Sequence, residues 1–212
     1  IKLPLYILKA DGGTFEIDQS SKCPVQTIHS GSAASIMGIM SLADHIEDAI
    51  ALDIGGTTTD IALFADGAPL LEPLGVTIGN HKTLVRGLMT KSIGIGGDSK
   101  VKYENGEVII GPVREGPAAA FGGQSPTPTD AMIVLGLINI GDFRKASAAI
   151  STIADAMCCD IQKAAQKIFN TACQKIISTV NEMITEVNNK PVYTIHEILE
   201  EKRLEPKILY VV

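Results

Sequence analysis

The stretch Ala51-Leu52-Asp53-Ile54-Gly55-Gly56-Thr57-Thr58-Thr59-Asp60-Ile61-Ala62-Leu63-Phe64 indicates a strand, a sharp loop and a second strand. Apolar residues 49–52 precede the loop and apolar residues 61–64 follow it, which is typical of two buried strands. Two adjacent glycines let the backbone turn and approach a ligand closely, and successive amide N–H groups in such a turn form an anion-binding nest. The stretch therefore predicts a phosphate loop.

Two aspartates, Asp53 and Asp60, flank this loop. A carboxylate beside a phosphate repels it unless a divalent cation, usually with its waters, lies between them. Phosphate plus Mg²⁺ is therefore the interpretation that accounts for both features. The alternative is a plain glycine hairpin in which the threonines cap and the aspartates make turn hydrogen bonds.

Other nucleotide-binding loops are excluded by the sequence. No G-x-x-x-x-G-K-[ST] segment occurs, so a Walker A loop is absent. The G-x-G-x-x-G pattern that begins at Gly94 fails at Ser99, so a Rossmann fingerprint is absent as well.

Composition limits the class of protein. The 212 residues suffice for one large or two small domains with a real core. With 18 Lys plus Arg against 24 Asp plus Glu, the net charge of -6 disfavours nucleic-acid and anionic-membrane partners, so a bound polyphosphate needs local donors. The four cysteines suggest neither a zinc site nor a disulfide framework. No signal peptide or run of roughly 20 apolar residues is seen. We expect a soluble, cytoplasmic protein.

The remaining chain alternates strands, hairpins and helices. We expect a strand over 3–8, a helix over 33–40 opened by serine caps, and hairpins at Asp66-Gly67 and Asn105-Gly106. Helices are expected over 132–137, after Asp142 and after Asp160, with a final apolar strand over 207–212. A long ordered loop rich in Gly, Pro and Ala spans 111–128 and carries Arg114 and Glu115.

Several residues are better explained by structure than by chemistry. The Asp11-Gly12-Gly13 segment is a turn signal, and Thr194-Ile195-His196-Glu197 predicts a helix start with a capping box. His45, His81 and His196 are isolated, and no H-E-x-x-H motif follows His196.

Six segments together resemble the hydantoinase A and oxoprolinase family, within the superfamily of actin, sugar-kinase and heat-shock-chaperone ATPases. They run in family order across about two thirds of the chain: 10–14, 30–34, 53–60, 92–99, 110–112 and 126–131. The chain departs from the family pattern at Ser32, where proline is usual, at Met89, often acidic, at Asp98, often glycine, and at 116–119, where the family has Gly-Pro-Ala-Cys.

The resemblance implies an α/β fold, a ribonuclease-H-like domain of the actin-type ATPase superfamily with a mixed sheet and flanking helices. We expect residues 1–212 to be part of a hydantoinase A-type ATPase domain. It would comprise a lead-in strand and helix (1–48), phosphate-loop hairpins with a Gly/Pro-rich loop (49–141), and a helical part with a final strand (142–212).

The resemblance also assigns roles to the loop residues. Asp53 would position Mg²⁺ or the attacking group, and Asp60 would support the loop or bind a metal water. The resemblance therefore implies that both aspartates are catalytic residues. The expected phosphate-binding residues of the loop are Gly55, Gly56, Thr57, Thr58 and Thr59.

A second glycine segment lies about 40 residues after the first. In the superfamily a similar segment approaches the nucleotide phosphates, which implies that the Gly96 and Gly97 amides face the phosphate while Asp98 binds metal waters. The alternative is a bulge at a strand end with an exposed aspartate.

The implied activity is ATP-dependent hydrolysis of a cyclic amide of the hydantoin, N-methylhydantoin or 5-oxoproline type through carbonyl phosphorylation, with ATP and Mg²⁺ as cofactors. Two alternatives stay open: a subunit of an ATP-dependent ketone carboxylase and an ATP-gated, chaperone-like interaction module. A hydantoinase B-like partner subunit and a homo- or hetero-oligomer are expected. We expect the isolated chain to supply only part of the nucleotide site and to be inactive.

Overall fold

The computed structural model describes residues 3–43, 47–79 and 81–212. The chain forms two compact units, and each is discontinuous in sequence. Unit 1 comprises Ile1–Asp53, Asp60–Lys91 and Glu182–Val212, and unit 2 comprises Ile54–Thr59 and Ser92–Asn181. The glycine loop therefore belongs to unit 2, whereas the two aspartates that flank it belong to unit 1.

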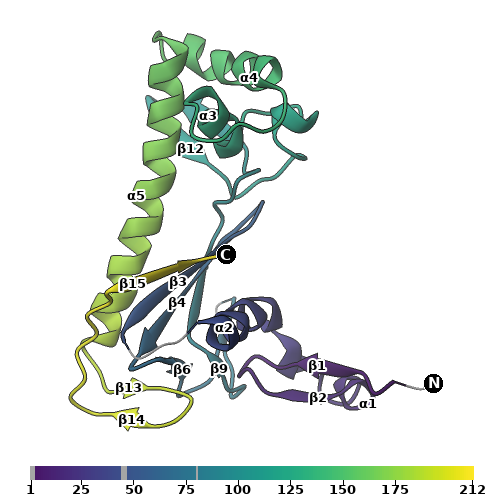
Figure 1. Cartoon of the computed structure of the whole chain (residues 1–212), viewed down its shortest axis with the longest axis vertical. Coiled ribbons are helices and arrows are strands. Elements are labelled where there is room, and N and C mark those ends of the chain that lie inside the picture. The colour runs from purple at the N-terminus through teal and green to yellow at the C-terminus, as the bar shows by residue number, and fades with distance from the viewer. Residues whose placement is uncertain (1–2, 44–46, 80) are drawn as a thin grey trace. The chain divides into compact units, whose positions relative to one another are not determined.

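A five-stranded mixed sheet contains the strands on either side of the loop. Its order is β10-β4-β3-β15, and β5 also pairs with β4. The strands are β3 (Ala49–Ile54), β4 (Thr59–Ala65), β5 (Ala68–Pro69), β10 (Thr90–Ile93) and β15 (Ile208–Val211). The last strand runs parallel to β3, with Ile208 opposite Ala49, so the predicted final strand is confirmed (Figure 1).

Helix α2 (Ser30–Leu42) packs on this sheet in unit 1 (Figure 1). Its buried residues Ala33, Ile36 and Ile39 join a core cluster with residues of β3 and β4. Such i, i+3 spacing gives the helix one apolar stripe, and a small residue within it permits close approach to the strands. The predicted helix is confirmed, but the predicted serine cap is wrong, because His29 at φ 59° takes the N-cap position without a side-chain cap bond.

Asp48, just before β3, fixes the chain that leads into β15. Its carboxylate accepts hydrogen bonds from the Glu205 N–H at 2.8 Å and the Asp66 N–H at 3.1 Å, and Lys202 Nζ lies 2.9 Å away. Burial alone would raise the pKa of Asp48, but these donors outweigh it and lower the pKa. The Asp66-Gly67 turn adjacent to it has positive φ at both residues, as its hairpin requires.

Short hairpins and helices complete unit 1. They are β1 (Tyr6–Leu8) with β2 (Thr14–Glu16), β6 (Leu71–Glu72) with β9 (Gly87–Leu88), β7 (Thr77–Ile78) with β8 (His81–Lys82), β13 (Val192–Tyr193) with β14 (Ile198–Leu199), the helix α1 (Ile17–Ser20) and the 3-10 helix η1 (Pro24–Thr27). The predicted helix start at 194–197 is wrong. Thr194 N–H instead donates to the Glu197 carbonyl at 3.0 Å, which closes the turn between β13 and β14.

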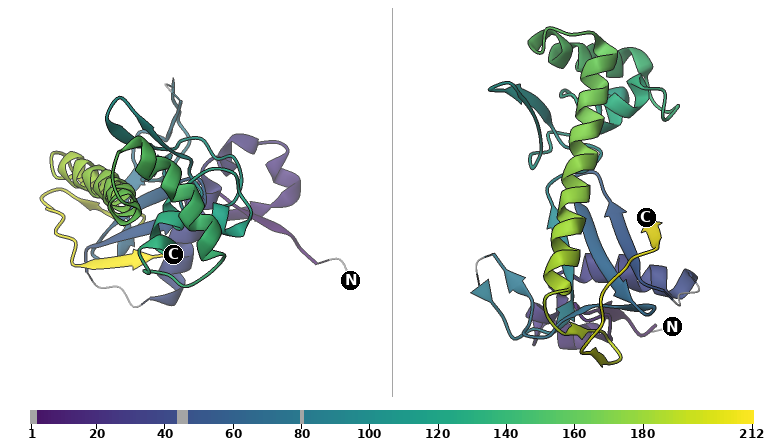
Figure 2. Two further views of the ribbon diagram at one scale, coloured as in Figure 1. Left: turned by 90° about the horizontal axis from the view of Figure 1, so that it is seen from above. Right: turned by 90° about the vertical axis from the view of Figure 1, so that its left-hand side faces the viewer.

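Unit 2 is mainly helical. Its elements are the hairpin β11 (Val101–Glu104) and β12 (Glu107–Ile110), the 3-10 helix η2 (Ala119–Phe121), α3 (Pro128–Val134), α4 (Phe143–Ala156) and most of α5 (Ile161–Val187). The three α-helices contribute alanine and isoleucine side chains to one core cluster, including Ala131, Ile150 and Ile168. Figure 2 shows the long helix α5 in light green. The predicted helices after Asp142 and Asp160 and the Asn105-Gly106 hairpin are confirmed, whereas the helix expected over 132–137 is shifted to Pro128–Val134. No helix in the described residues has the length and apolar character needed to cross a membrane.

Candidate functional site

The glycine loop at 55–58 is held by the second glycine segment through backbone hydrogen bonds within unit 2. Gly97 N–H donates to the Gly55 carbonyl at 2.9 Å, and Asp98 N–H donates to the Gly56 carbonyl at 2.7 Å. Within the loop, Gly55 N–H donates to the Thr58 carbonyl at 2.9 Å. The two segments, about 40 residues apart in the chain, therefore form one rigid backbone cluster.

Close approach of the two backbones explains why glycine occupies position 96. A Cβ atom on Gly96 would lie 2.5 Å from the Gly55 carbonyl oxygen and 2.6 Å from the Thr57 nitrogen. Real Cβ atoms do not approach backbone atoms so closely, and neither loop has a flexible side chain there that could move aside. At Gly56 the nearest atom to an added Cβ is instead a side-chain oxygen, Asp98 Oδ2, at 2.8 Å.

Three consecutive N–H groups of the loop point to anion binding. Among the described residues, no protein acceptor is found for the N–H groups of Gly56, Thr57 and Thr58, nor for the hydroxyls of the two threonines. Gly56 and Thr57 are partly exposed and Thr58 is exposed, so these donors are accessible to a ligand. Successive free amides on a tight turn are a nest for a phosphate or carboxylate oxygen.

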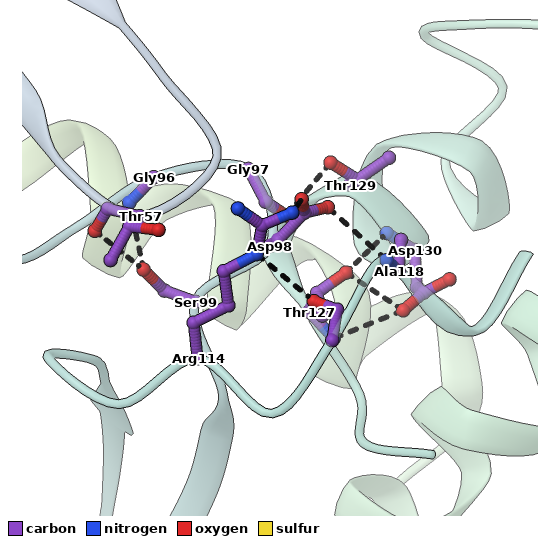
Figure 3. Close-up of polar contacts among 11 residues, drawn as sticks. Thr57, Gly96, Gly97, Asp98, Ser99, Arg114, Ala118, Thr127, Thr129 and Asp130 are labelled. Atoms are coloured by element: carbon purple, nitrogen blue, oxygen red, sulfur yellow. Dashed lines mark hydrogen bonds and ion pairs between the residues drawn. The ribbon is translucent and has the colours of Figure 1, made fainter. Parts of the chain in front are cut away.

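Several other groups expected to donate to a phosphate instead donate to acceptors within the protein. Gly96 N–H donates to Ser99 Oγ at 2.8 Å, and the Ser99 hydroxyl lies 3.2 Å from the Thr57 carbonyl oxygen (Figure 3). The amides of Gly55, Gly96 and Gly97 are thus used to shape the loop. Thr59 is fully buried, and its hydroxyl donates to the Ile95 carbonyl at 2.7 Å, so its expected contact with a ligand is wrong.

Asp98 is engaged by protein donors. Its Oδ2 lies 2.7 Å from Arg114 Nη2, and its Oδ1 accepts the Ala118 N–H at 3.1 Å (Figure 3). Both partners lie in the long Gly/Pro-rich loop, so Asp98 connects that loop to the glycine cluster. From the sequence, Arg114 is recognisable only as part of the long loop, because no spacing rule relates it to Gly56.

A fully buried carboxylate, Asp130 at the start of α3, organises the other end of that loop. It accepts hydrogen bonds from Ala119 N–H at 3.0 Å, Ala120 N–H at 2.8 Å and the Thr127 hydroxyl at 2.8 Å. Thr129, which precedes Asp130, donates its hydroxyl to the Gly97 carbonyl at 2.7 Å. The N-terminus of α3 therefore supports the segment that holds the phosphate loop.

The two flanking aspartates lie in unit 1, where α2 contacts both. Ser35 Oγ donates to Asp53 Oδ2 at 2.5 Å, and Ser32 Oγ donates to Asp60 Oδ2 at 2.8 Å. Residues three apart share one face of a helix, so α2 presents both hydroxyls together. The four side chains line a pocket of ≈ 10 Å³, room for about one water molecule. Neither hydroxyl was assigned this role from the sequence.

These carboxylates suit a metal held largely by water and phosphate. In the part of the chain that is described, no group of three or more His, Cys, Asp or Glu residues could hold a metal by itself. Mg²⁺ commonly keeps several waters and takes only one or two carboxylates together with substrate phosphates. The Oδ1 atoms of Asp53 and Asp60 accept no hydrogen bond from the described residues, which fits such a role. His45 lies outside the described residues.

Comparison with known proteins decides the family. The sequence profile described as Hydantoinase/oxoprolinase matches residues 1–211. The chain belongs to the hydantoinase/oxoprolinase family. The resemblance carried by the six sequence segments is thereby confirmed.

Members of this family with similar sequences have different named activities. The chain is 32% identical over 123 residues to the acetophenone carboxylase gamma subunit of Aromatoleum aromaticum, covering 54% of this chain and 17% of that one. It is 30% identical over 146 residues to the 5-oxoprolinase of Saccharomyces cerevisiae, covering 62% of this chain and 11% of that one. The family is therefore related to both carboxylases and amide hydrolases.

Solved structures confirm the fold. Nucleotide-free acetone carboxylase, from a study of ATP-dependent acetone carboxylation, matches with a TM-score of 0.77 and 22% identity over 87% of this chain and 28% of that one. The ATP-dependent caprolactamase of Pseudomonas jessenii matches with a TM-score of 0.61 and 23% identity over 89% of this chain and 29% of that one. The fold is the actin-like ATPase type, as expected. The chain spans between 11% and 29% of the length of these four relatives.

Proposed function

We propose that this chain supplies the second phosphate loop of an ATP-dependent enzyme that opens a cyclic amide of the hydantoin, N-methylhydantoin or 5-oxoproline type. The observation that carries the proposal is the nest of free N–H groups at Gly56, Thr57 and Thr58. The backbone that presents them is fixed by bonds from Gly97 and Asp98 before any ligand arrives. Preorganised donors of this kind stabilise developing negative charge with little reorganisation.

Asp53 would hold Mg²⁺, and Asp60 would support the loop or bind a metal water. Asp53 precedes Gly55 by two residues in the chain, which is why this carboxylate is proposed for the metal that accompanies the phosphate. The Ser35 hydroxyl, 2.5 Å from Asp53 Oδ2, would fix this carboxylate and leave Oδ1 for the metal or its water.

When bound, MgATP would supply a phosphoryl group that activates the amide carbonyl towards water. The ring would then open by cleavage of its C–N bond, with the nitrogen leaving as an amine, and hydrolysis would release the phosphate and the carboxylate. The chain's own part is to bind the phosphates through the loop amides and the hydroxyls of Thr57 and Thr58. A hydantoinase B-like partner subunit is part of the proposal, supported by the naming of one relative as a gamma subunit.

A subunit of an ATP-dependent ketone carboxylase is the second candidate, favoured by the similarity to acetophenone carboxylase and by the fold shared with acetone carboxylase. The two activities differ in the substrate that stimulates ATP turnover. ADP release by the full-length protein, with its partner subunit where one copurifies, is the measurement.

Stimulation by 5-oxoproline or hydantoin supports the cyclic-amide assignment. Stimulation by acetone or acetophenone with bicarbonate, but not by a cyclic amide, overturns that assignment in favour of the carboxylase. Stimulation by unfolded peptide alone would overturn both and indicate a chaperone-like module.

A further inference from the structure

Arg114 and its partner Asp98 place an ion pair beside the phosphate loop, and Asp98 Oδ2 lies 2.8 Å from a Cβ atom built on Gly56. A Cβ atom built on Gly56 would lie 3.2 Å from Arg114 Nη1 and 3.3 Å from its Cζ. The guanidinium therefore lies next to the open side of Gly56, beside the nest of free amides. All of these atoms belong to unit 2.

The guanidinium is fixed by two protein acceptors and retains a third donor group. Nη2 binds Asp98 Oδ2 at 2.7 Å, and Nε donates to the Gly116 carbonyl at 3.2 Å (Figure 3). For Nη1, the described residues provide no acceptor, and the side chain is 44% exposed. The arginine is thus held in one orientation while the nitrogen nearest the loop stays available.

Lys100, which follows the second glycine segment in the chain, is engaged in an ion pair of its own. Lys100 Nζ lies 2.6 Å from Glu115 Oε1, and the Ser125 hydroxyl donates to the other oxygen of the same carboxylate. Hydrogen bonds from Lys100 and then Ser125 lower the pKa of Glu115, so this pair stays ionised at neutral pH. In a chain of net charge -6, Arg114 is a cation that lies beside the glycine loop and retains one nitrogen, Nη1, for which the described residues provide no acceptor.

We infer that Arg114 is a phosphate-binding residue: Nη1 donates to an oxygen of the polyphosphate held by the Gly56–Thr58 nest, while Asp98 positions the guanidinium through Nη2. The inference rests on the proposed binding of ATP at this loop. A planar guanidinium suits this task, because its donors are arranged as a rigid fork that contacts a carboxylate and a phosphate at the same time. Asp98 accordingly acts on Arg114 and not on metal waters.

The test measures affinity for MgATP and for magnesium tripolyphosphate, by calorimetry on the full-length protein. Tripolyphosphate carries the phosphate chain without the nucleoside. Arg114→Gln is expected to weaken binding of both probes by the same factor, about tenfold or more, as expected for the loss of a hydrogen bond from a charged donor. Arg144→Gln is the matched control, because Arg144 is exposed on α4 and its side chain has no described partner. It should bind both probes like the wild type.

The outcomes separate this inference from the proposed function. Wild-type affinity in a folded Arg114→Gln protein overturns the role of Arg114 while leaving ATP binding intact. A loss seen with MgATP but not with tripolyphosphate also overturns it, because it would place Arg114 near the nucleoside. Failure of the wild-type protein to bind either probe overturns the proposed function and, with it, the inference. The thermal midpoint of each variant shows whether it is folded.

Discussion

Replacing Gly96 by alanine tests whether the second glycine segment shapes the phosphate loop. The new Cβ would lie 2.5 Å from the Gly55 carbonyl oxygen and 2.5 Å from the Gly56 carbonyl carbon. Both are backbone atoms, so the two segments must separate. Separation breaks the hydrogen bonds that Gly97 and Asp98 donate to the loop, which measure 2.9 and 2.7 Å.

The expected loss of stability has two parts. Each broken backbone hydrogen bond removes about 1 kcal/mol. Forcing an extra carbon into a packed site costs roughly 1–3 kcal/mol, which the separation of the segments partly relieves. We therefore expect Gly96→Ala to lower the free energy of unfolding by about 2–4 kcal/mol, and to abolish binding of MgATP because the nest loses its shape.

Urea unfolding followed by circular dichroism measures the first effect, and calorimetry with MgATP measures the second. Gly38→Ala is the matched control. Gly38 lies inside α2 with no atom within 4 Å of an added Cβ, so alanine there should raise stability by about 0.5–1 kcal/mol. A Gly96→Ala protein that unfolds at the wild-type urea concentration would refute the close approach of the two segments.

Substitutions at Asp53, Gly56 and Asp48 test the metal site, the phosphate loop and the fold. Asp53→Ala should lower the kcat of ATP hydrolysis by the full-length protein roughly a hundredfold, the scale of lost electrostatic stabilisation; near-normal turnover, like that expected of the exposed control Asp155→Ala, would contradict the assignment. Gly56→Val should abolish MgATP binding but shift the thermal midpoint by only a few degrees, because the new Cβ atom would meet the end of the Asp98 side chain and no backbone atom. Intact binding together with a large loss of stability would indicate a plain structural hairpin. The folded protein lowers the pKa of Asp48, so the stabilisation that this carboxylate provides is present above its unfolded pKa of about 3.9 and is lost as pH falls through the folded value. The stability of the wild-type protein in urea should therefore decline below about pH 4. An equal decline in Asp48→Asn would exclude this carboxylate as a cause.

Much of the site could be located from the sequence because its signals are local. Two glycines between apolar runs determine a strand-loop-strand hairpin, and its amides at 56–58 are the free donors that the pattern predicts. Where the sequence assigned ligand contacts to Thr59 and to the amides of Gly96 and Gly97, the structure uses them internally. A pattern of residue types shows which donors exist, but it does not show which donors already have a protein acceptor.

The arrangement of side chains around the loop is decided by contacts distant in sequence. Arg114 reaches Asp98 across 16 residues, and Ser35 reaches Asp53 across 18. The two members of each pair lie outside any common helix or strand, so no periodicity relates them, and the pairs meet only after separate parts of the chain have packed. The parallel pairing of β15 with β3 is of the same kind, because it joins Ile208 to Ala49.

Neighbouring residues and short ordered motifs are enough to predict the family, the α/β class, the hairpin turns and the capped helices after Asp142 and Asp160. Folding is needed to show that the second glycine segment holds the first through its backbone and that α2 binds both aspartates through serine hydroxyls. The position of Arg114 beside Gly56 likewise emerges only in the folded chain. The physical reason is that local propensity acts over a few residues, whereas hydrogen-bond partners in a folded chain are chosen by packing.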